Sequence, residues 1–258
     1  MSNLYEISKE TYCIPKIINN KIILLNTNIN SNDITILDKE LNVIFKKDIN
    51  NDVTLESMVF VKNKYYLFCN DLKNVYNELL VYVYDIDFNF LDIITIPINY
   101  TTKFNYVFTD KHNIILLVKD KEKINFSLLN KEKGFVDMIV KTYEDDIYCD
   151  LIFDGEIILL NHALLKVNEN YDIIIRNRIV ETDEIILGAV SSQKDMYVFT
   201  KKNNSTSIIK YNDNETHKGN ANIATNTEKV MIMENDLLQN DVYSLIHSNN
   251  TFYIVKNQ

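Results

Sequence analysis

The chain has 258 residues, enough for one large all-β domain, and 46% of them are hydrophobic, enough for a sizeable buried core. Its formal net charge is −9, and its two arginines are Arg176 and Arg178. The acidic balance argues against the clustered positive charge that binding to nucleic acid or to an anionic membrane requires. The shortage of arginine excludes an arginine cluster that would recognise a phosphate or a carboxylate.

A short pattern recurs six times along the chain: a hydrophobic strand, a polar turn of two to four residues, and a run of four apolar residues. The apolar runs begin, in chain order, at Ile22, Tyr65, Ile114, Ile157, Met196 and Phe252. Successive runs are 43, 49, 43, 39 and 56 residues apart. Because a four-stranded propeller blade takes about 40–50 residues, this period predicts six blades, with an insertion between residues 212 and 240 in the last interval.

The repeat divides one domain, residues 1–258, into six blades. In chain order the blades span about 16–53, 54–102, 103–144, 145–183, 184–229, and 230–258 together with 1–15. Val242–Val255 supplies two strands of the sixth blade, and Leu4–Ile7 with Tyr12–Ile14 should supply its outer pair. We therefore expect the N-terminal strands to close the ring by pairing in the C-terminal blade, because a closed ring has no open sheet edge.

Within a blade, inner and outer strands differ in their pattern. A fully apolar run such as Ile157–Leu160 indicates a strand covered on both faces, whereas alternation, as in Val81–Tyr84, indicates an outer strand with one covered face. Asn and Gly in the first turns tolerate the positive φ that tight hairpins need. The second turns open with Asp or Asn, at 38–42, 85–89, 130–134 and 168–172. Segment 212–229 is predicted to be either a long outer loop or a frayed fourth strand, and Lys229–Leu238 either a short helix or a strand.

The period, the apolar strand pairs and the polar turns resemble those of β-propellers as an architecture, over nearly the whole chain. The resemblance implies an all-β fold, a six-bladed β-propeller of four-stranded antiparallel blades. It does not extend to a particular family. The chain has no tryptophan for the Trp-Asp dipeptide of WD40 blades, its four glycines are too few for the glycine pairs of kelch blades, and its two arginines are too few for the arginine triad of sialidases.

One segment has the spacing of a metal-binding loop. Residues 85–89, Asp-Ile-Asp-Phe-Asn, place oxygen ligands at alternate positions, as the start of a calcium loop does. The glycine position is occupied by Phe90 and the position of the bidentate glutamate by Ile96. A polar hairpin is therefore the favoured interpretation, and no metal or other cofactor is predicted.

The four histidines, which have no second His or Cys at zinc spacing, are His112, His162, His217 and His247. His112 and His247 fall in or beside the first turns of blades three and six, so they could converge on one rim. Two unconnected turn residues at the surface are the favoured interpretation.

The cysteines Cys13, Cys69 and Cys149 are odd in number and far apart, which argues against a disulfide framework. No Gly-x-Ser-x-Gly nucleophile motif is present. Cys69 and Cys149 adjoin apolar strands, where a cysteine usually behaves as a small buried hydrophobe.

Paired carboxylates occur at Asp145-Asp146 and at Asp183-Glu184, in the crossings between blades. Glycosidases use two carboxylates about 5–10 Å apart, which makes these pairs the acid–base candidates of the chain. Solvated loop charge is the favoured interpretation, and no catalytic residue is assigned.

Tyrosines are frequent in and near the predicted strands. They include Tyr65, Tyr66, Tyr82, Tyr84, Tyr100, Tyr106 and Tyr171. Tyrosine buries a large area while it keeps a polar tip, so most of these side chains should pack between blades, and a minority at the rim could bind a partner or a sugar.

These observations favour a non-enzymatic function: a rigid platform for contact with a protein partner, or a structural component of a larger assembly such as a phage or phage-like particle. The alternative is a propeller that binds, and could hydrolyse, a carbohydrate or another small ligand at its axial channel or rim. A third hypothesis is a regulatory domain that recognises a peptide strand in a groove between blades. The chain shows no signal peptide or transmembrane segment, so we expect a cytoplasmic protein with a protein partner and without nucleic-acid or membrane contacts.

Overall fold

The computed structural model shows six four-stranded antiparallel sheets. It describes residues 4–7, 11–28, 30–71, 78–97, 106–109, 114–120, 123–130, 134–142, 149–153, 156–160, 162–168, 170, 172–192, 195–212, 215–221, 223–232, 242–248 and 251–257. The chain forms two compact units, each with three of the sheets. The N-terminal unit comprises Tyr12–Ile36 and Val43–Asp145, and the C-terminal unit comprises Met1–Thr11, Leu37–Asn42 and Asp146–Gln258. Among the described residues, no helix is long and apolar enough to cross a membrane.

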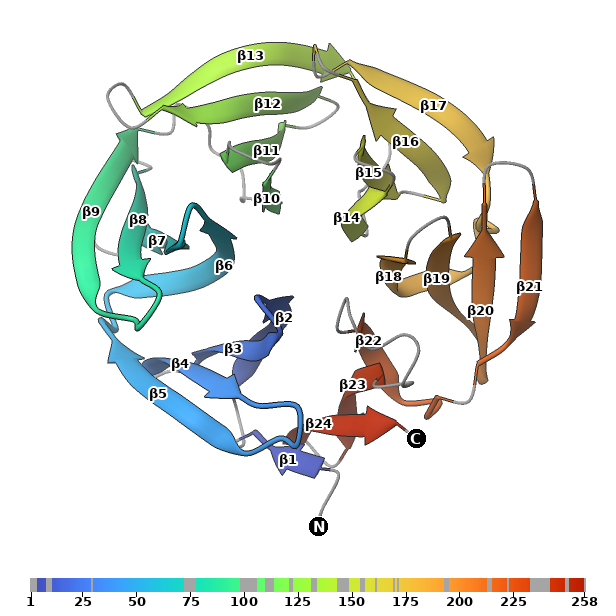
Figure 1. Ribbon diagram of the computed structural model, residues 1–258, viewed down its shortest axis with the longest axis horizontal. Coiled ribbons are helices and arrows are strands. Elements are labelled where there is room, and N and C mark those ends of the chain that lie inside the picture. The colour runs from blue at the N-terminus through green and yellow to red at the C-terminus, as the bar shows by residue number, and fades with distance from the viewer. Residues whose placement is uncertain are drawn as a thin grey trace. The chain divides into compact units, whose positions relative to one another are not determined.

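The N-terminal unit holds the first three sheets, or blades, in chain order (Figure 1). Blade one contains β2 (Tyr12–Ile18), β3 (Lys21–Thr27), β4 (Asn32–Leu37) and β5 (Val43–Ile49). Blade two contains β6 (Val53–Val61), β7 (Lys64–Asp71), β8 (Glu78–Asp85) and β9 (Phe90–Pro97). Blade three contains β10 (Tyr106–Thr109), β11 (Ile114–Asp120), β12 (Lys123–Asn130) and β13 (Gly134–Thr142). Each blade pairs its strands in sequence order, and the first strands of successive blades contact one another.

The C-terminal unit holds the other three blades. Blade four contains β14 (Cys149–Phe153), β15 (Glu156–Leu160), β16 (Ala163–Val167) and β17 (Ile173–Arg178). Blade five contains β18 (Ile185–Ser192), β19 (Asp195–Lys202), β20 (Ser205–Tyr211) and β21 (Thr216–Asn220). Blade six contains β22 (Thr227–Ile232), β23 (Val242–Ser248), β24 (Thr251–Asn257) and, from the other end of the chain, β1 (Leu4–Glu6).

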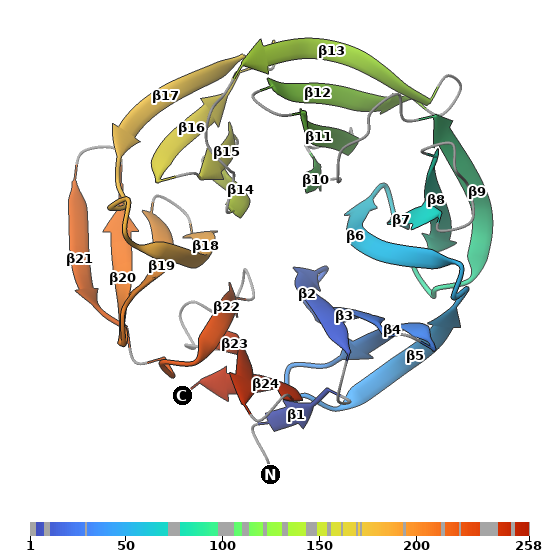
Figure 2. The same ribbon diagram turned by 180° about the vertical axis from the view of Figure 1, so that it is seen from behind.

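Blade six joins the two ends of the chain, as the sequence predicted. β1 pairs antiparallel with β24, with Leu4 opposite Val255, and both views draw the two strands side by side (Figure 1, Figure 2). The prediction that Tyr12–Ile14 also joins this blade is wrong, because β2 pairs with β3 in blade one and places Cys13 opposite Asn26. The apolar pattern of β2 continues through Ile18, and seven residues paired with β3 form more backbone hydrogen bonds than a three-residue outer strand could.

This correction also removes the predicted insertion. The apolar run at Phe252 belongs to β24, the third strand of its blade, whereas the earlier runs belong to second strands. The second strand of blade six is β23, which begins at Val242, 47 residues after β19 begins at Asp195. Segment 212–229 contains the exposed fourth strand β21, and β22 makes the start of Lys229–Leu238 a strand. The remainder of that segment lies outside the described residues.

The apolar runs form the cores of both units. In the N-terminal unit, Ile22–Leu25 of β3 and Tyr65–Phe68 of β7 are buried on both faces. In the C-terminal unit, Ile158, Met196 and Ile209 share one core cluster. Each side chain of this size contributes about 1.5–3 kcal/mol of hydrophobic free energy when it is fully buried.

The turns have the backbone geometry that their residue types predict. Asn19 and Asn20, with φ of 51° and 54°, connect β2 to β3, and Lys62 and Asn63, with φ of 50° and 61°, connect β6 to β7. Two consecutive residues at positive φ match the right-handed twist of a hairpin, and asparagine tolerates that conformation better than most residues do.

The second turns share a capping arrangement. The side-chain oxygen of the first residue accepts the backbone N–H groups two and four residues later, at 2.8–2.9 Å, in the turns that begin at Asp38, Asp85 and Asn168. In the first two of these turns, the fourth residue is a buried hydrophobic residue at positive φ, Leu41 (66°) and Phe88 (62°). The capped turn therefore directs one apolar side chain back into the protein.

Each of these two turns packs against strands of another blade in its own unit. In the N-terminal unit, Lys47 Nζ of β5 donates to the carbonyl of Phe88 at 3.1 Å, and the rings of Phe45 and Phe88 stack with centroids 4.9 Å apart. In the C-terminal unit, the hydroxyl of Tyr243 on β23 donates to the carbonyl of Lys39 at 2.8 Å. These two second turns therefore link blades as well as strands.

Candidate functional site

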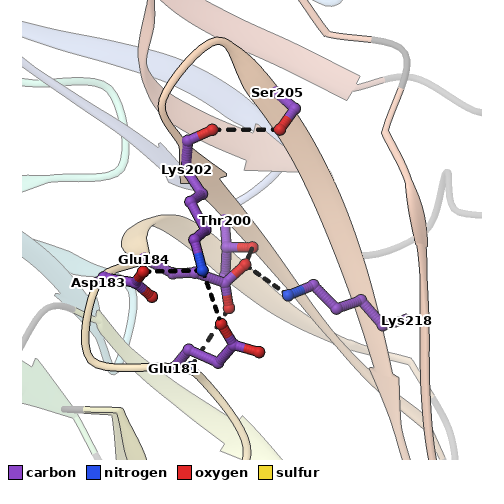
Figure 3. Close-up of polar contacts among 7 residues, drawn as sticks. All are labelled: Glu181, Asp183, Glu184, Thr200, Lys202, Ser205 and Lys218. Atoms are coloured by element: carbon purple, nitrogen blue, oxygen red, sulfur yellow. Dashed lines mark hydrogen bonds and ion pairs between the residues drawn. The ribbon is translucent and has the colours of Figure 1, made fainter.

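The predicted carboxylate pair Asp183-Glu184 lies in the crossing from β17 to β18, within a network of charged groups (Figure 3). Glu184 is only 3% exposed. Its Oε1 lies 2.6 Å from Lys218 Nζ on β21 and accepts the hydroxyl of Thr200 on β19 at 3.2 Å. Glu184 therefore links the crossing loop to the second and fourth strands of blade five.

A second lysine holds the rest of the crossing loop. Lys202 Nζ lies 2.7 Å from Asp183 Oδ2 and 3.0 Å from Glu181 Oε2. Glu184 Oε2 accepts the backbone N–H of Glu181 at 3.3 Å, and the carbonyl of Lys202 accepts the hydroxyl of Ser205 at 3.1 Å (Figure 3). Three carboxylates and two lysines thus form one connected network at this end of blade five.

The electrostatics of the network keep both predicted carboxylates ionised. Burial by itself would raise the pKa of Glu184, but hydrogen bonds from Lys218 and from the Glu181 N–H outweigh it and lower that pKa. The hydrogen bond from Lys202 lowers the pKa of Asp183. A general acid at neutral pH needs a raised pKa, so this pair is suited to holding the loop and not to protonating a leaving group.

The prediction that Asp183 and Glu184 are solvated loop charges is confirmed for Asp183 and is wrong for Glu184. Asp183 is exposed, whereas Glu184 is buried, because Lys218 and Thr200 replace the water that its carboxylate would otherwise bind. The other predicted pair, Asp145-Asp146, lies outside the described residues.

The segment with calcium-loop spacing is a polar hairpin, as the sequence favoured. The carboxylate of Asp85 accepts the N–H groups of Asp87 and Asn89 and the side-chain amide of Asn89, the last at 2.9 Å. Its oxygens are thus used within the turn. In the part of the chain that the structure describes, no three His, Cys, Asp or Glu side chains are grouped to share a metal ion.

The two histidines predicted to occupy equivalent turns are not equivalent. His247 lies near the end of β23, the second strand of its blade, where it pairs with Phe252 of the third strand and the two rings stack with centroids 4.5 Å apart. His112 lies between β10 and β11, a first and a second strand, and is itself outside the described residues. His162 accepts two backbone N–H groups at its carbonyl, and His217 lies on the exposed β21, 3.0 Å from Glu215.

The buried cysteine and tyrosine side chains are packing residues. Cys69 is fully buried in the core of blades one and two, and burial raises the pKa of its thiol, so it behaves as the small hydrophobe that was predicted. Cys13 is also buried and forms no disulfide. Tyr65, Tyr66 and Tyr84 are buried, and Tyr82 is partly buried against the same core.

The remaining predicted cysteine and tyrosine positions fall partly or wholly outside the described residues. The backbones of Cys149 and Tyr106 lie in β14 and β10, but their side chains are outside the described part of the structure. Tyr100 and Tyr171 lie wholly outside it.

Sequence reasoning missed a polar cluster on the first strands of blades one and two. Glu56 lies at a bulge in β6, where the register to β7 shifts between Leu55 and Ser57. Its Oε1 accepts the hydroxyl of Thr54 and the amide of Asn70, both at 2.8 Å. Bulges re-aim side chains and often adjoin binding sites.

β2 of blade one contributes to the same cluster. Lys16 Nζ donates to the hydroxyl of Ser57 at 2.7 Å. Partial burial and the negative charge of Glu56 raise the pKa of Tyr12, whose side chain is largely exposed. These residues are far apart in sequence, and only the contact between β2 and β6 brings them together, so no local motif could have revealed them.

Six large exposed hydrophobic side chains lie on the outer strands of blades one and two and in the β8–β9 turn of the N-terminal unit. We call this set the β5–β9 surface, and it comprises Val43, Ile44, Ile86, Phe90, Leu91 and Ile93, each 43–52% exposed. They lie on β5 and on the β8–β9 hairpin, the outer strands of neighbouring blades (Figure 1). Sequence reasoning considered only Ile86 and Phe90 among these residues, and only as positions in the segment with calcium-loop spacing.

A row of aromatic contacts links the two parts of this surface. The ring of Phe45 on β5 stacks on the ring of Phe88. The ring centroid of Tyr84 lies 6.5 Å from that of Phe88 and 6.1 Å from that of the exposed Phe90, which it contacts edge to face. Lys47 Nζ lies 4.6 Å above the ring of Tyr84. The exposed Phe90 therefore packs against buried aromatic rings. This packing reduces the side-chain conformational entropy that is lost when a partner binds.

Comparison with known proteins identifies the fold of the chain but not its family. No protein-family model matches the sequence, and no curated protein matches it. Virginiamycin B lyase from Staphylococcus aureus is similar in structure, with a TM-score of 0.59, 6% identity and coverage of 99% of each chain. The β-propeller domain of the Trilobed protease from Pyrococcus furiosus has a TM-score of 0.53 and 11% identity over 95% of this chain and 94% of that one.

A protein of unknown function from Bacteroides caccae has a TM-score of 0.59 and 7% identity over 83% of this chain and 84% of that one. Identities this low show the fold alone. The six four-stranded antiparallel sheets and these likenesses define the class of the protein: it is a six-bladed β-propeller whose N-terminal strand completes the C-terminal blade.

Proposed function

We propose that this propeller is a non-enzymatic platform that binds a protein partner through the β5–β9 surface. The observation that carries the proposal is the presence of six large hydrophobic side chains, each about half exposed, on β5, on β9 and in the turn that joins β8 to β9. Large apolar side chains exposed on adjoining parts of a protein surface mark interaction sites. The net charge of −9 favours a protein over a nucleic acid or an anionic membrane as the partner.

The state of the acid–base candidates supports the same proposal. Asp183 and Glu184 are each ion-paired with a lysine, and the pKa of each is lowered. Their contacts stabilise the crossing into blade five, a structural role. A component of a larger assembly, such as a phage-like particle, is one specific form of the platform.

Affinity capture from a native extract of the source organism tests the proposal. The bait proteins are the natural chain, the double variant Phe90→Ser/Ile93→Ser, and Ile174→Ser as a matched control at an exposed isoleucine of β17. We expect the natural chain and the control to retain one stable partner, and the double variant to lose it. Equal recovery on all three baits, or no partner on the natural chain, would contradict the platform function.

A second candidate function is binding of a polyhydroxylated small ligand, such as a carbohydrate, at the polar cluster of β2 and β6. The exposed Tyr12 ring supplies the aromatic face, and the Glu56 carboxylate and the Lys16 ammonium group supply the hydrogen-bonding groups, that such ligands need. Glycan-array screening of the natural chain and of Glu56→Gln tests this candidate. We expect a glycan signal that Glu56→Gln weakens; the absence of any signal from the natural chain would exclude it.

A further inference from the structure

We infer that β1 is an exchangeable strand, and that β24 of one copy of the chain accepts β1 of a second copy in place of its own. The inference concerns blade six alone and does not depend on the platform function. β1 itself shows which segment fits the edge of β24, because it pairs there with Leu4 opposite Val255 and Glu6 opposite Tyr253. A second copy carries the same strand and can form the same contacts.

β1 differs from the other fourth strands in how the chain holds it. β5, β9, β13, β17 and β21 each follow the third strand of the same blade, so a covalent connection keeps each of them near its pairing partner. β1 instead continues through residues 7–11 into β2 of blade one, which belongs to the other compact unit. β1 can therefore separate from β24 while β22, β23 and β24 stay paired.

The contacts that hold β1 are few. Within the described residues, β1 has three residues, whereas the other fourth strands have five to nine. Leu4 and Glu6 of β1 are exposed. The buried anchor is the next residue, Ile7, which is 2% exposed and donates its N–H to the carbonyl of Phe252 at 2.9 Å. A strand with so few buried contacts belongs to the part of a fold that opens most readily.

The open edge of β24 selects β1 of a second copy as its occupant. An uncovered edge presents unpaired N–H and C=O groups to any extended segment, but β1 also brings Ile7 to the buried position that the departing Ile7 leaves. Exchange replaces each contact by an identical one, so its main cost is the association of two molecules. The net charge of −9 on each copy opposes that association, and added salt should therefore favour the exchanged dimer.

Hydrogen exchange of the natural chain tests whether β1 opens by itself. We expect the Ile7 amide to exchange at least about tenfold faster than the slowest amides of β23, the strand that is paired on both sides in the same blade. An Ile7 amide as slow as those of β23 would show that β1 separates only when the whole blade unfolds, and would overturn the inference.

Disulfide trapping between two differently tagged full chains tests the exchange itself. One chain carries Glu6→Cys and the other carries Tyr253→Cys, two positions that face each other across the β1–β24 pair. We expect mild oxidation of the mixture to give a covalent heterodimer, in a yield that rises with salt between about 50 mM and about 500 mM. The matched control replaces the second chain by one with Thr216→Cys, at an exposed position of β21, and should give only background.

Ile7→Ala, placed in one chain or the other, assigns the heterodimer to strand exchange. In the Glu6→Cys chain it weakens the incoming strand, so the yield should fall at least about fivefold. In the Tyr253→Cys chain it weakens the resident strand, so the yield should rise by a similar factor, because a larger fraction of β24 is open. Phe90→Ser/Ile93→Ser, on the β5–β9 surface, should change neither yield.

Three outcomes of the trapping experiment overturn the inference. The first is a yield no higher than that of the Thr216→Cys control. The second is a yield that Ile7→Ala leaves unchanged, or changes in the same direction in both chains. The third is a heterodimer that Phe90→Ser/Ile93→Ser abolishes, which would show that the β5–β9 surface joins the copies. Circular dichroism melting shows whether each chain is folded, and if Ile7→Ala unfolds the chain, hydrogen exchange of the natural chain decides.

Discussion

At the scale of single residues, Phe88 combines a strained backbone with a central packing position. Its φ of 62° is in the left-handed region, which costs a residue with a side chain about 1–2 kcal/mol. Its ring stacks on Tyr65 at 4.2 Å and on Phe45 at 4.9 Å and is almost wholly buried. The aromatic contacts with both blades offset the strain of the turn.

We expect Phe88→Ala to lower the free energy of unfolding by about 3–5 kcal/mol, because it removes a buried ring that blades one and two share. Phe90→Ala, which changes an exposed ring two residues away, should change it by less than about 1 kcal/mol. Urea denaturation measures both. Phe88→Gly should cost no more than Phe88→Ala, since glycine relieves the positive φ. Equal losses from Phe88→Ala and Phe90→Ala would show that the turn does not anchor the blade.

Ionisation of Glu184 should make the free energy of unfolding depend on pH. We expect Glu184→Gln to lower the free energy of unfolding at pH 7 by about 1–2 kcal/mol, because a charge-assisted hydrogen bond to the partly exposed Lys218 is lost. Asp183→Asn, at an exposed carboxylate, should have the smaller effect.

The pH dependence follows from the direction of the pKa shift of Glu184. The folded pKa lies below the ordinary value of 4.5, so the ionised carboxylate stabilises the fold above that value. This contribution is lost as the pH falls through the folded pKa. Urea denaturation between about pH 7 and pH 3 should therefore show the natural chain and Glu184→Gln converging in stability at the acid end. A difference that stays constant with pH would exclude the ion pair as its source.

At the scale of elements, blade six depends on a short strand from the other end of the chain. β1 pairs with β24 over three residues, and the next residue, Ile7, donates its N–H to the carbonyl of Phe252 at 2.9 Å and is only 2% exposed. We expect Ile7→Ala to lower the free energy of unfolding by about 2–4 kcal/mol. Leu4→Ala, at a side chain that is 42% exposed, should cost less than about 1 kcal/mol.

Thermal melting compares these two variants, and light scattering detects association. Release of β1 would uncover the edge of β24, so Ile7→Ala should also associate more readily than Leu4→Ala. Indistinguishable behaviour of the two variants would mean that β1 contributes little to the last blade.

The second turn of blade one is held by a side chain of blade six within the C-terminal unit. The buried Tyr243 donates its hydroxyl to the carbonyl of Lys39 at 2.8 Å. We expect Tyr243→Phe to cost about 1 kcal/mol and to raise amide exchange at Leu41 and Asn42. Tyr253→Phe, a matched change at a partly exposed tyrosine of β24, serves as the control. If the two changes give the same exchange pattern, the hydrogen bond does not hold the turn.

The element scale also shows where pattern reading succeeds. The Asp85 hairpin was interpreted correctly because its capping bonds are local and depend on residues within four positions. The order of strands in blade six was misjudged because the β23–β24 hairpin has the same apolar pattern as a first hairpin. Apolar pattern alone does not distinguish the second turn of a blade from the first.

At the scale of the whole molecule, the two compact units use the same four-stranded module three times each, and their individual residues serve different purposes. The β5–β9 surface and the Glu56 cluster both lie on blades one and two, the Glu184 network lies on blade five, and each is assembled from more than one strand. The repeated four-stranded sheet accounts for the fold, and residues that differ from blade to blade form the candidate binding surfaces.

The all-β class, the number of blades, the polar turns that open with Asp or Asn and the pairing of the N-terminal strand in the last blade could all be predicted from the sequence. These features depend on period, turn residues and apolar runs, which act over a few neighbouring positions. The three-dimensional fold was needed to show that Tyr12–Ile14 begins blade one, that Glu184 is buried beside Lys218, and that Phe90 and Ile93 remain exposed. The physical reason is that burial and ion pairing arise from contacts between segments distant in sequence, which no local pattern of residues encodes.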